Sequence, residues 1–300
     1  VALLAIGVAA VAHAQSPAAL GDLEFTGDPD GFRSARIRAG ALYPYGSYFE
    51  HAGVAAQTTH YAQGGWSRDV VGIVGIWRDQ KAATLEGVRA EAGLVDVAGR
   101  TRVVGDATWG WRPRPETGLE LIAAGDLVAT RTAIERAIAY GFFAASVEQT
   151  FAERFTAIGL VGYQPFSDGN DRLHWRGRLI WQALPDEGVN VQLRWRQYES
   201  RKDDVDGAYF NPDRYRQWQA VVGFRRRFAG LVWLGALGAG RETINGADTH
   251  PVRTAELRAE GAVSQRLGIT WHASYNRSTG YVDSPDYAYR DVGVTLIYSF

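Results

Sequence analysis

The chain has 300 residues, of which 46% are hydrophobic, and its 32 basic and 33 acidic residues nearly cancel. The absence of cysteine excludes a disulfide framework and a thiolate metal site, and the balanced charge does not indicate nucleic acid as a partner. Lys81 and Lys202 are the only lysines, so arginine carries almost all of the positive charge. Arginine binds anions through a planar, bidentate group and also stacks on rings.

Residues 1–14 are typical of a secretory signal peptide, because the apolar run VALLAIGVAAVA leads into the small-residue cleavage pattern Ala12-His13-Ala14. The basic region that should precede the run is missing, so we expect the given chain to begin inside its leader. A short buried helix is the alternative. Residues 15–31 would then form a short periplasmic segment, and residues 32–300 the main domain. After Gln15 no apolar run approaches ~18 residues, so no spanning helix is expected.

Apolar and polar residues alternate through much of the remaining chain, most clearly in residues 102–111, 172–181, 189–196, 267–276 and 291–300. A period of two is typical of a strand with one apolar and one polar face. The pattern predicts an all-β protein with about 14 to 16 strands after Gln15, and the alternation is weakest in the N-terminal ones. Residues 126–137 are also compatible with a short helix in a loop.

The expected connections have two lengths. Tight turns are predicted at residues 44–47, 113–117, 185–188 and 228–230, and longer polar loops at residues 58–67, 200–214, 244–251 and 277–287. Short turns at one end and long loops at the other are typical of an outer-membrane barrel. A soluble periplasmic β-sandwich would instead bury its apolar set.

The apolar set is rich in Trp, Tyr and Phe near strand ends, as in an interfacial aromatic girdle. The terminal Phe300 also fits the C-terminal strand signal of outer-membrane proteins. We therefore predict a closed antiparallel transmembrane β-barrel of about 16 strands, with 14 as the alternative, in the bacterial outer membrane. Lipid would contact the apolar face, and both termini would be periplasmic.

Two stretches on the loop side carry a more specific pattern. YQPFSDGNDR spans residues 163–172, and GAYFNPDRY spans residues 207–215. Asp168-Gly169 is a strong tight-turn pair, and Asn170 tolerates a left-handed conformation. Asn211 before Pro212 is restricted to extended geometry and starts a turn. Loop architecture without ligand contact is therefore one interpretation of both stretches.

In this order, the two stretches resemble the C-terminal barrel of the poly-β-1,6-N-acetyl-D-glucosamine export porins, over residues 141–300. The resemblance implies that the chain passes a biofilm exopolysaccharide to the cell surface. It also implies that the matching residues help to shape the extracellular exit: Phe166, Asp168, Asn170, Arg172, Tyr209, Phe210, Asn211 and Pro212.

Proteins of that family have a periplasmic tetratricopeptide superhelix before the barrel. Residues 15–31 are too few for repeats of ~34 residues. We therefore expect either a separate periplasmic scaffold or a barrel-only relative, which leaves recruitment of a polymer deacetylase open. An inner-membrane synthase would be the other partner that the resemblance implies.

Strand parity predicts which charged side chains face the lumen. One basic set falls on the polar phase of three successive strands, together with Tyr198: Arg172, Arg176, Arg178, Arg194, Arg196, Arg225 and Arg227. A second set near the C-terminus contains Glu256, Arg258, Glu260 and Asp291. Such charges select passing solutes, or pair across the lumen and stiffen it. Arginines repel a partly deacetylated, cationic polymer, so either the acidic set dominates or the polymer is neutral or anionic.

One constellation raises the question of catalysis. His272, Ser274 and Asn276 share one face of a strand, as in outer-membrane lipid A deacylases and phospholipases, where His and Ser act as base and nucleophile. Those enzymes attack lipid from outside the barrel, whereas Trp271 and Tyr275 occupy the outer face here. We therefore predict no enzyme activity and no cofactor. The six histidines are scattered, so no metal site is predicted. A general diffusion porin and a passive structural barrel remain as alternatives.

Overall fold

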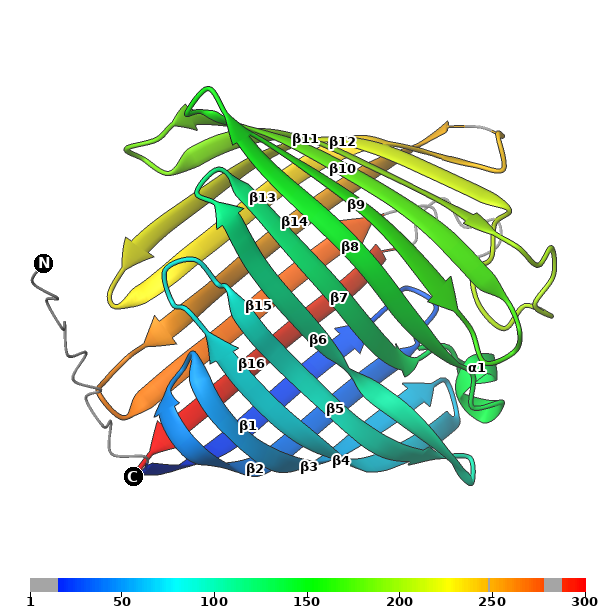
Figure 1. Cartoon of the computed structure of the whole chain (residues 1–300). Helices are drawn as coiled ribbons and strands as arrows, with labels where there is room; N and C mark the ends of the chain where they lie inside the picture. The colour runs from blue at the N-terminus through cyan, green and yellow to red at the C-terminus, as the bar shows by residue number, and fades with distance from the viewer. Residues whose placement is uncertain (1–15, 248, 278–287) are drawn as a thin grey trace, which may run out of the picture.

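A computed structural model of the chain describes residues 16–247, 249–277 and 288–300. Within these ranges the chain folds into one closed antiparallel β-barrel with a single short helix (Figure 1). No helix among the described residues is long and apolar enough to cross a membrane. The elements are β1 (Ser16–Gly27), β2 (Arg33–Ser47), β3 (Glu50–Gln63), β4 (Trp66–Gln80), β5 (Gly87–Val97), β6 (Arg100–Arg114), β7 (Thr117–Leu127), α1 (Arg131–Glu135), β8 (Ala139–Phe151), β9 (Phe155–Pro165), β10 (Asp171–Leu184), β11 (Val189–Ser200), β12 (Arg214–Phe228), β13 (Leu231–Ile244), β14 (Thr249–Ala262), β15 (Leu267–Arg277) and β16 (Ala288–Ser299).

Each strand pairs with its neighbours in sequence, and β1 pairs with β16 to close the barrel, from Ala18 opposite Ser299 to Gly27 opposite Arg290. The barrel therefore has no free edge. The predicted count of about 16 strands is confirmed. β1 begins and β16 ends at one end of the barrel, here called the termini end; the opposite end, which carries α1 and the loop between β11 and β12, is called the loop end.

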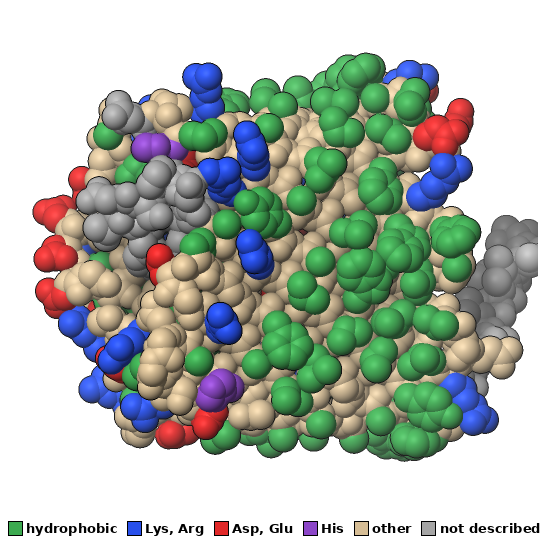
Figure 2. Space-filling model, turned by 180° about the vertical axis from the view of Figure 1, so that it is seen from behind, with side chains coloured by type: hydrophobic (Ala, Val, Ile, Leu, Met, Phe, Trp, Pro, Cys, Tyr) green, Lys and Arg blue, Asp and Glu red, His purple; other side chains and the backbone are tan. Residues whose placement is uncertain are grey.

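Large apolar side chains cover the outside of the barrel (Figure 2). Val103 on β6 and Leu237 at the middle of β13 are each 69% exposed. Aromatic side chains mark the termini end, where Tyr43, Phe228 and Phe300 are 66%, 71% and 67% exposed. An apolar surface that encircles a closed barrel is stable only against hydrocarbon. The outer face therefore meets lipid, as the alternation predicts.

The sequence-based boundary between residues 15–31 and residues 32–300 is wrong. Ser16–Gly27 is strand β1, which hydrogen-bonds to both β2 and β16. The charged residues Asp22 and Glu24 make this segment resemble a loop in the sequence. In the structure both face the lumen, where charge is tolerated. The signal peptide expected at residues 1–14 lies outside the described residues, as does most of the loop expected at residues 277–287.

The prediction of a long polar loop at residues 58–67 is also wrong. β3 continues to Gln63 and β4 begins at Trp66, so only a two-residue turn, Gly64-Gly65, lies between them. The polar run Thr58-Thr59-His60 lies within β3. Thr is β-branched and suits a strand, and Thr59 is buried on the inner side. The expected tight turns at residues 185–188 and 228–230, and the long loop at residues 200–214, are present.

The short helix falls where it was expected. Thr130 caps α1, and its side-chain oxygen accepts a hydrogen bond from the backbone N–H of Ala133. Ile134 is fully buried against inward-facing valines of β4, β5 and β6, among them Val97. The segment between β7 and β8 therefore packs against the inner wall of the barrel near the loop end, and it positions the backbone that the neighbouring loops contact.

Candidate functional site

The two stretches singled out in the sequence meet at the loop end. We call residues 166–172 together with residues 209–212 the loop junction. Asn170 lies at its centre and is only 1% exposed. Its Nδ2 donates to the Tyr209 hydroxyl (3.1 Å) and to Asn211 Oδ1 (2.8 Å), while its Oδ1 accepts from the backbone N–H of Lys202 (3.0 Å). One buried amide thus joins the turn before β10 to the loop before β12.

Aromatic stacking reinforces this contact. The rings of Phe166 and Tyr209 stack with centroids 4.8 Å apart and planes 8° apart. The Tyr209 hydroxyl donates to Asp168 Oδ2 (2.9 Å). Burial raises the pKa of Tyr209, so the hydroxyl keeps the proton that this hydrogen bond needs. The left-handed position of the turn is taken by Gly169, with φ of 86°, and not by Asn170.

Arg172 lies beneath this stack and does not line the lumen as a free charge. Its guanidinium carbon is 4.9 Å from the ring centre of Phe166, 5.1 Å from that of Tyr198 and 5.5 Å from that of Tyr209. It also donates to the carbonyl of Phe210 and to Ser200 Oγ (3.1 Å). Buried cation–π contacts of this kind stabilise the arrangement. Arg172 is therefore a positioning residue of the loop junction.

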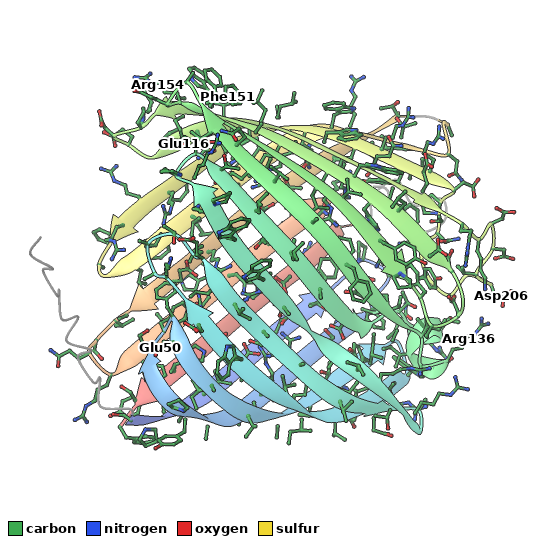
Figure 3. The ribbon with its side chains drawn as sticks, in the orientation of Figure 1. Glu50, Glu116, Arg136, Phe151, Arg154 and Asp206 are labelled. Atoms are coloured by element: carbon green, nitrogen blue, oxygen red, sulfur yellow. The ribbon has the colours of Figure 1, made fainter. Side chains whose placement is uncertain are left out.

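The helical segment between β7 and β8 supports the loop junction from the side. Its Thr130 hydroxyl donates to the Ala208 carbonyl, and Ala133 packs in one apolar cluster with Phe166 and Tyr209. At the rim, Arg136 and Asp206 point toward one another with 3.2 Å between Nη1 and Oδ2 (Figure 3). Three loops are thus tied together at one side of the loop end, which fixes the shape of the opening there.

The other predicted arginines of β10 and β11 face the lumen, and we call these four residues, Arg176, Arg178, Arg194 and Arg196, the arginine wall. The barrel register places Arg176 directly opposite Arg196, and Arg178 directly opposite Arg194. Like charges in direct cross-strand opposition destabilise a sheet. Within the described part of the chain, no carboxylate pairs with Arg176 or Arg178. This part of the lumen therefore offers two guanidinium groups to a passing solute.

Other predicted lumen residues are paired instead. Arg194 reaches from β11 to Glu256 on β14, with 3.0 Å between Nη1 and Oε1. Glu260 pairs with Arg258 on its own strand at 2.7 Å. Asp291 pairs with His272 Nε2 at 2.9 Å. Glu256 and Asp291 are therefore each in contact with a side chain of another strand, whereas Glu260 is paired within β14.

Tyr198 and Arg196 belong to an aromatic cluster on the inner wall. The Tyr198 ring stacks on Tyr215 at 4.9 Å and lies 5.2 Å from His174. Arg196 donates to the Tyr215 hydroxyl (2.8 Å), and that hydroxyl donates to the buried carboxylate of Glu242. Both faces of the Tyr198 ring are thereby engaged, so it supports the wall and does not offer a free face for stacking on a sugar.

Arg225 and Arg227 keep the inward parity that the sequence predicts, toward the end of β12 at the termini end. Arg225 lines a cavity of about 430 Å³ together with Arg178, Arg194 and Glu256. Arg227 is exposed. Arg225 thus extends the arginine wall toward the termini end of the lumen.

Sequence reasoning missed a second charged region, on the N-terminal strands. Arg38 on β2 pairs with Asp22 on β1 (2.8 Å) and with Glu91 on β5. Arg36 pairs with Glu24. These residues line a lumen cavity of about 530 Å³, whose charged lining is Asp22, Glu24, Glu91, Asp106, Asp126, Arg36, Arg38, Arg78, Arg89 and Arg258. The signal was present as the alternations Asp22-x-Glu24 and Arg36-x-Arg38, but the overall alternation of the N-terminal strands is too weak to assign their faces from the sequence.

The charge balance of this second region differs from that of the arginine wall. Five carboxylates face five guanidinium groups around the larger cavity, whereas the arginine wall is basic. No group of three or more potential metal ligands is present among the residues that the structure describes. The lumen therefore combines a neutral, strongly hydrogen-bonding side with a positive side.

Comparison with one solved structure supports this architecture. A solved structure described as a bacterial polysaccharide outer membrane secretin matches 96% of this chain and 99% of its own, with a TM-score of 0.65 and 12% sequence identity. CdiB from Acinetobacter baumannii matches 95% of this chain and 60% of its own (TM-score 0.47, 10% identity), and OprD from Pseudomonas aeruginosa 95% and 94% (TM-score 0.44, 11% identity). No protein-family model and no curated protein matches the chain. The chain has the fold of an outer-membrane β-barrel.

Proposed function

We propose that the chain is a porin-like conduit in the bacterial outer membrane that exports an exopolysaccharide of the poly-N-acetylglucosamine type during biofilm matrix formation. The loop junction carries the proposal, because the two stretches that resemble the export porins interlock through Asn170 at one mouth of the barrel. The similarity in fold to a polysaccharide outer membrane secretin supports it. In this placement the termini end is periplasmic and the loop end is extracellular.

The chemistry of the lumen favours a polymer without strong net charge. A polysaccharide presents many hydroxyl and amide groups, and exposed paired charges such as Arg89–Asp106 can still donate and accept hydrogen bonds at their free atoms. A cationic chain would be repelled by Arg176 and Arg178. The balanced charges of the larger cavity give an anionic chain no net attraction on that side. A neutral, acetylated polymer is not repelled by Arg176 or Arg178 and can hydrogen-bond to the paired charges.

A general diffusion porin is the second candidate. It would share the charged lumen, and the exposed arginine wall would favour small anions. It gives no reason for the loop junction, which is why it ranks second. A lipid hydrolase fits less well, because His272 lies on the inner side paired with Asp291 and cannot meet lipid from outside.

The proposal extends to location and partners. A signal peptide at residues 1–14 would direct the chain through the inner membrane. A separate periplasmic tetratricopeptide scaffold or deacetylase would deliver the polymer, and an inner-membrane synthase would make it. Neighbouring genes that encode a glycosyltransferase and a polysaccharide deacetylase would support this assignment.

Deletion of the gene tests the proposed function. We expect surface polysaccharide to fall in the deletion strain and to return when the wild-type chain is supplied. An unchanged amount of surface polysaccharide in the deletion strain would reject the exporter proposal.

Complementation with an Arg176→Glu, Arg178→Glu double variant then identifies the charge of the polymer. These two arginines are chosen because reversal at Arg194 would also break its pair with Glu256. A neutral polymer predicts retained export, an anionic polymer predicts a loss, and a cationic polymer predicts a gain. The matched control is Arg114→Glu, Arg154→Glu, which changes the same net charge at exposed residues near turns of the termini end.

A further inference from the structure

Arginines interrupt the apolar outer face at one end of the barrel. Figure 2 shows a row of basic side chains that crosses this face on the side of the loop end. The strands β12 to β16 and β2 each contribute an outward-facing arginine within the five residues nearest that end, and β1, which lies between β16 and β2, contributes none. We call these residues the arginine arc: Arg216 on β12, Arg241 on β13, Arg253 on β14, Arg277 on β15, Arg290 on β16 and Arg33 on β2.

Register and burial establish that the arc faces outward. Arg241 lies beside Trp218, which is 52% exposed on the lipid side. Its sequence neighbour Glu242 is 1% exposed and faces inward. Across the gap left by β1, Arg33 packs over Gly27: a Cβ added there would lie 3.8 Å from Arg33 Cγ. The arc therefore continues from Arg290 on β16, across Gly27 on β1, to Arg33 on β2.

The outward charges of the remaining strands have the opposite sign. At the loop end, Asp69 on β4, Asp96 on β5, Asp171 on β10 and Glu199 on β11 occupy outward positions. In the described strands β3–β11, no arginine faces outward at the loop end. The outer rim is thus divided into a basic arc over β12–β2 and a remainder with outward carboxylates, of which Asp171 and Glu199 pair with Arg201 and Arg214. A general attraction to lipid headgroups would not need this division, so the arc indicates a localised anionic partner.

Among the described residues, five of the six arginines of the arc have no carboxylate partner. Arg214 and Arg226 face outward too, but each has a carboxylate partner, Glu199 at 2.9 Å and Glu187 at 2.7 Å. Within the described residues, no carboxylate pairs with Arg33, Arg216, Arg241, Arg253 or Arg290. An anionic ligand would supply the counter-charge that the described residues do not give these five arginines.

We propose that the arginine arc binds the phosphate groups of a phosphorylated glycolipid in the outer leaflet. Guanidinium groups bind phosphate in a bidentate manner, and long arginine side chains reach headgroups while their stems contact apolar chains. The surface toward the membrane centre is apolar, with Leu237 69% and Val292 53% exposed. The ligand therefore needs acyl chains as well as phosphates, which excludes free phosphate. This inference depends on the outer-membrane placement but not on the transported solute.

The test measures binding of lipid A to the full chain refolded in an uncharged detergent, by native mass spectrometry. The arc variant is Arg241→Gln, Arg253→Gln, Arg290→Gln. Its matched control, with the same loss of charge at exposed residues at the termini end, is Arg114→Gln, Arg154→Gln, Arg266→Gln. Removal of three charge-assisted contacts should weaken binding at least about tenfold in the arc variant. The control should bind as the wild type does.

Equal affinities of the arc variant and the control would overturn the proposal, and so would equal affinity of the wild type for lipid A and phosphatidylglycerol. If the arc variant does not fold, as judged by heat-modifiable migration, the proposal is tested on the wild type alone. The wild type should then bind dephosphorylated lipid A at least about tenfold more weakly than lipid A. Ion conductance of the arc variant should match that of the wild type, because the arc lies outside the lumen. A loss of conductance would therefore bear on the proposed transport function and not on the proposed lipid binding.

Discussion

Asn170→Ala should release the loop between β11 and β12 while the barrel itself stays closed. Asn170 is 1% exposed and makes three hydrogen bonds, to Tyr209, Asn211 and the backbone of Lys202. Alanine removes all of them, and it leaves the Lys202 N–H without that acceptor. The strand pairs on either side of the loop do not involve the Asn170 side chain, so the effect should stay local.

The size of the effect follows from the hydrogen bonds. Each contributes about 0.5–1.5 kcal/mol net, and a buried partner left unsatisfied costs about 1–3 kcal/mol. Some of the freed groups will be hydrated, so we take a loss of about 2 kcal/mol in the free energy of loop docking. Because about 1.4 kcal/mol is tenfold in an equilibrium constant, the undocked population should rise about 30-fold.

Limited trypsinolysis of the folded barrel in detergent measures that population. Arg201 and Lys202 are cleavage sites within the loop, and the Lys202 backbone is held at both its N–H and its carbonyl. When docking and undocking are fast relative to cleavage, the cleavage rate follows the open population. We therefore expect cleavage at these sites to accelerate about 30-fold, with heat-modifiable migration unchanged.

Asn190→Ala is the matched control, because Asn190 accepts a side-chain hydrogen bond from Gln192 (2.7 Å) at the other end of β11. It removes the same atoms without touching the loop junction, and its cleavage pattern should resemble that of the wild type. An unchanged cleavage rate in Asn170→Ala would show that the junction does not depend on this amide, and the argument from the two stretches would fail.

Three further outcomes test other parts of the structure. Leu237→Arg, at the middle of β13 on the lipid side, should lower the free energy of unfolding in lipid vesicles by about 2–4 kcal/mol; an unchanged urea midpoint would place this face away from hydrocarbon. Arg176→Gln, Arg178→Gln should shift the reversal potential of bilayer currents toward cations, and no shift would remove the arginine wall from the ion path. Gly293→Ala should displace the His272 ring, because the added Cβ would lie 2.4 Å from Cε1, at a cost of about 1–3 kcal/mol in urea unfolding; wild-type stability would contradict that packing.

The barrel could be predicted from the sequence because the pattern that identifies each strand lies within that strand. Alternation of period two identifies a strand without knowledge of its partner, and parity alone placed Arg176 and Arg194 on the inner face. β1 was missed because its lumen face carries Asp22 and Glu24, which resemble loop residues when the neighbouring strand is unknown. The barrel closes through β1 and β16, a contact between the two ends of the chain that no local pattern contains.

The candidate site was only partly predictable, because its contacts are long-range. The resemblance selected Asn170 and Tyr209, but nothing local shows that two residues 39 positions apart share a hydrogen bond. The pair Arg194–Glu256 crosses from β11 to β14, so it depends on the curvature of the closed sheet. Arg172 was predicted as a lumen charge on correct parity, yet its position at the strand end brings it under the aromatic stack instead.

The central claim is that the lumen conducts a polysaccharide, and single-channel recording in a planar bilayer tests it most directly. Purified poly-β-1,6-N-acetylglucosamine oligomers are added on the side of the chain termini, and dextran of matched length is the control. The account predicts discrete current blockades with the acetylated oligomers at concentrations where dextran gives none. Open-channel current that neither polymer interrupts, or that both interrupt equally, would contradict a polysaccharide conduit of this specificity and would favour a general diffusion porin.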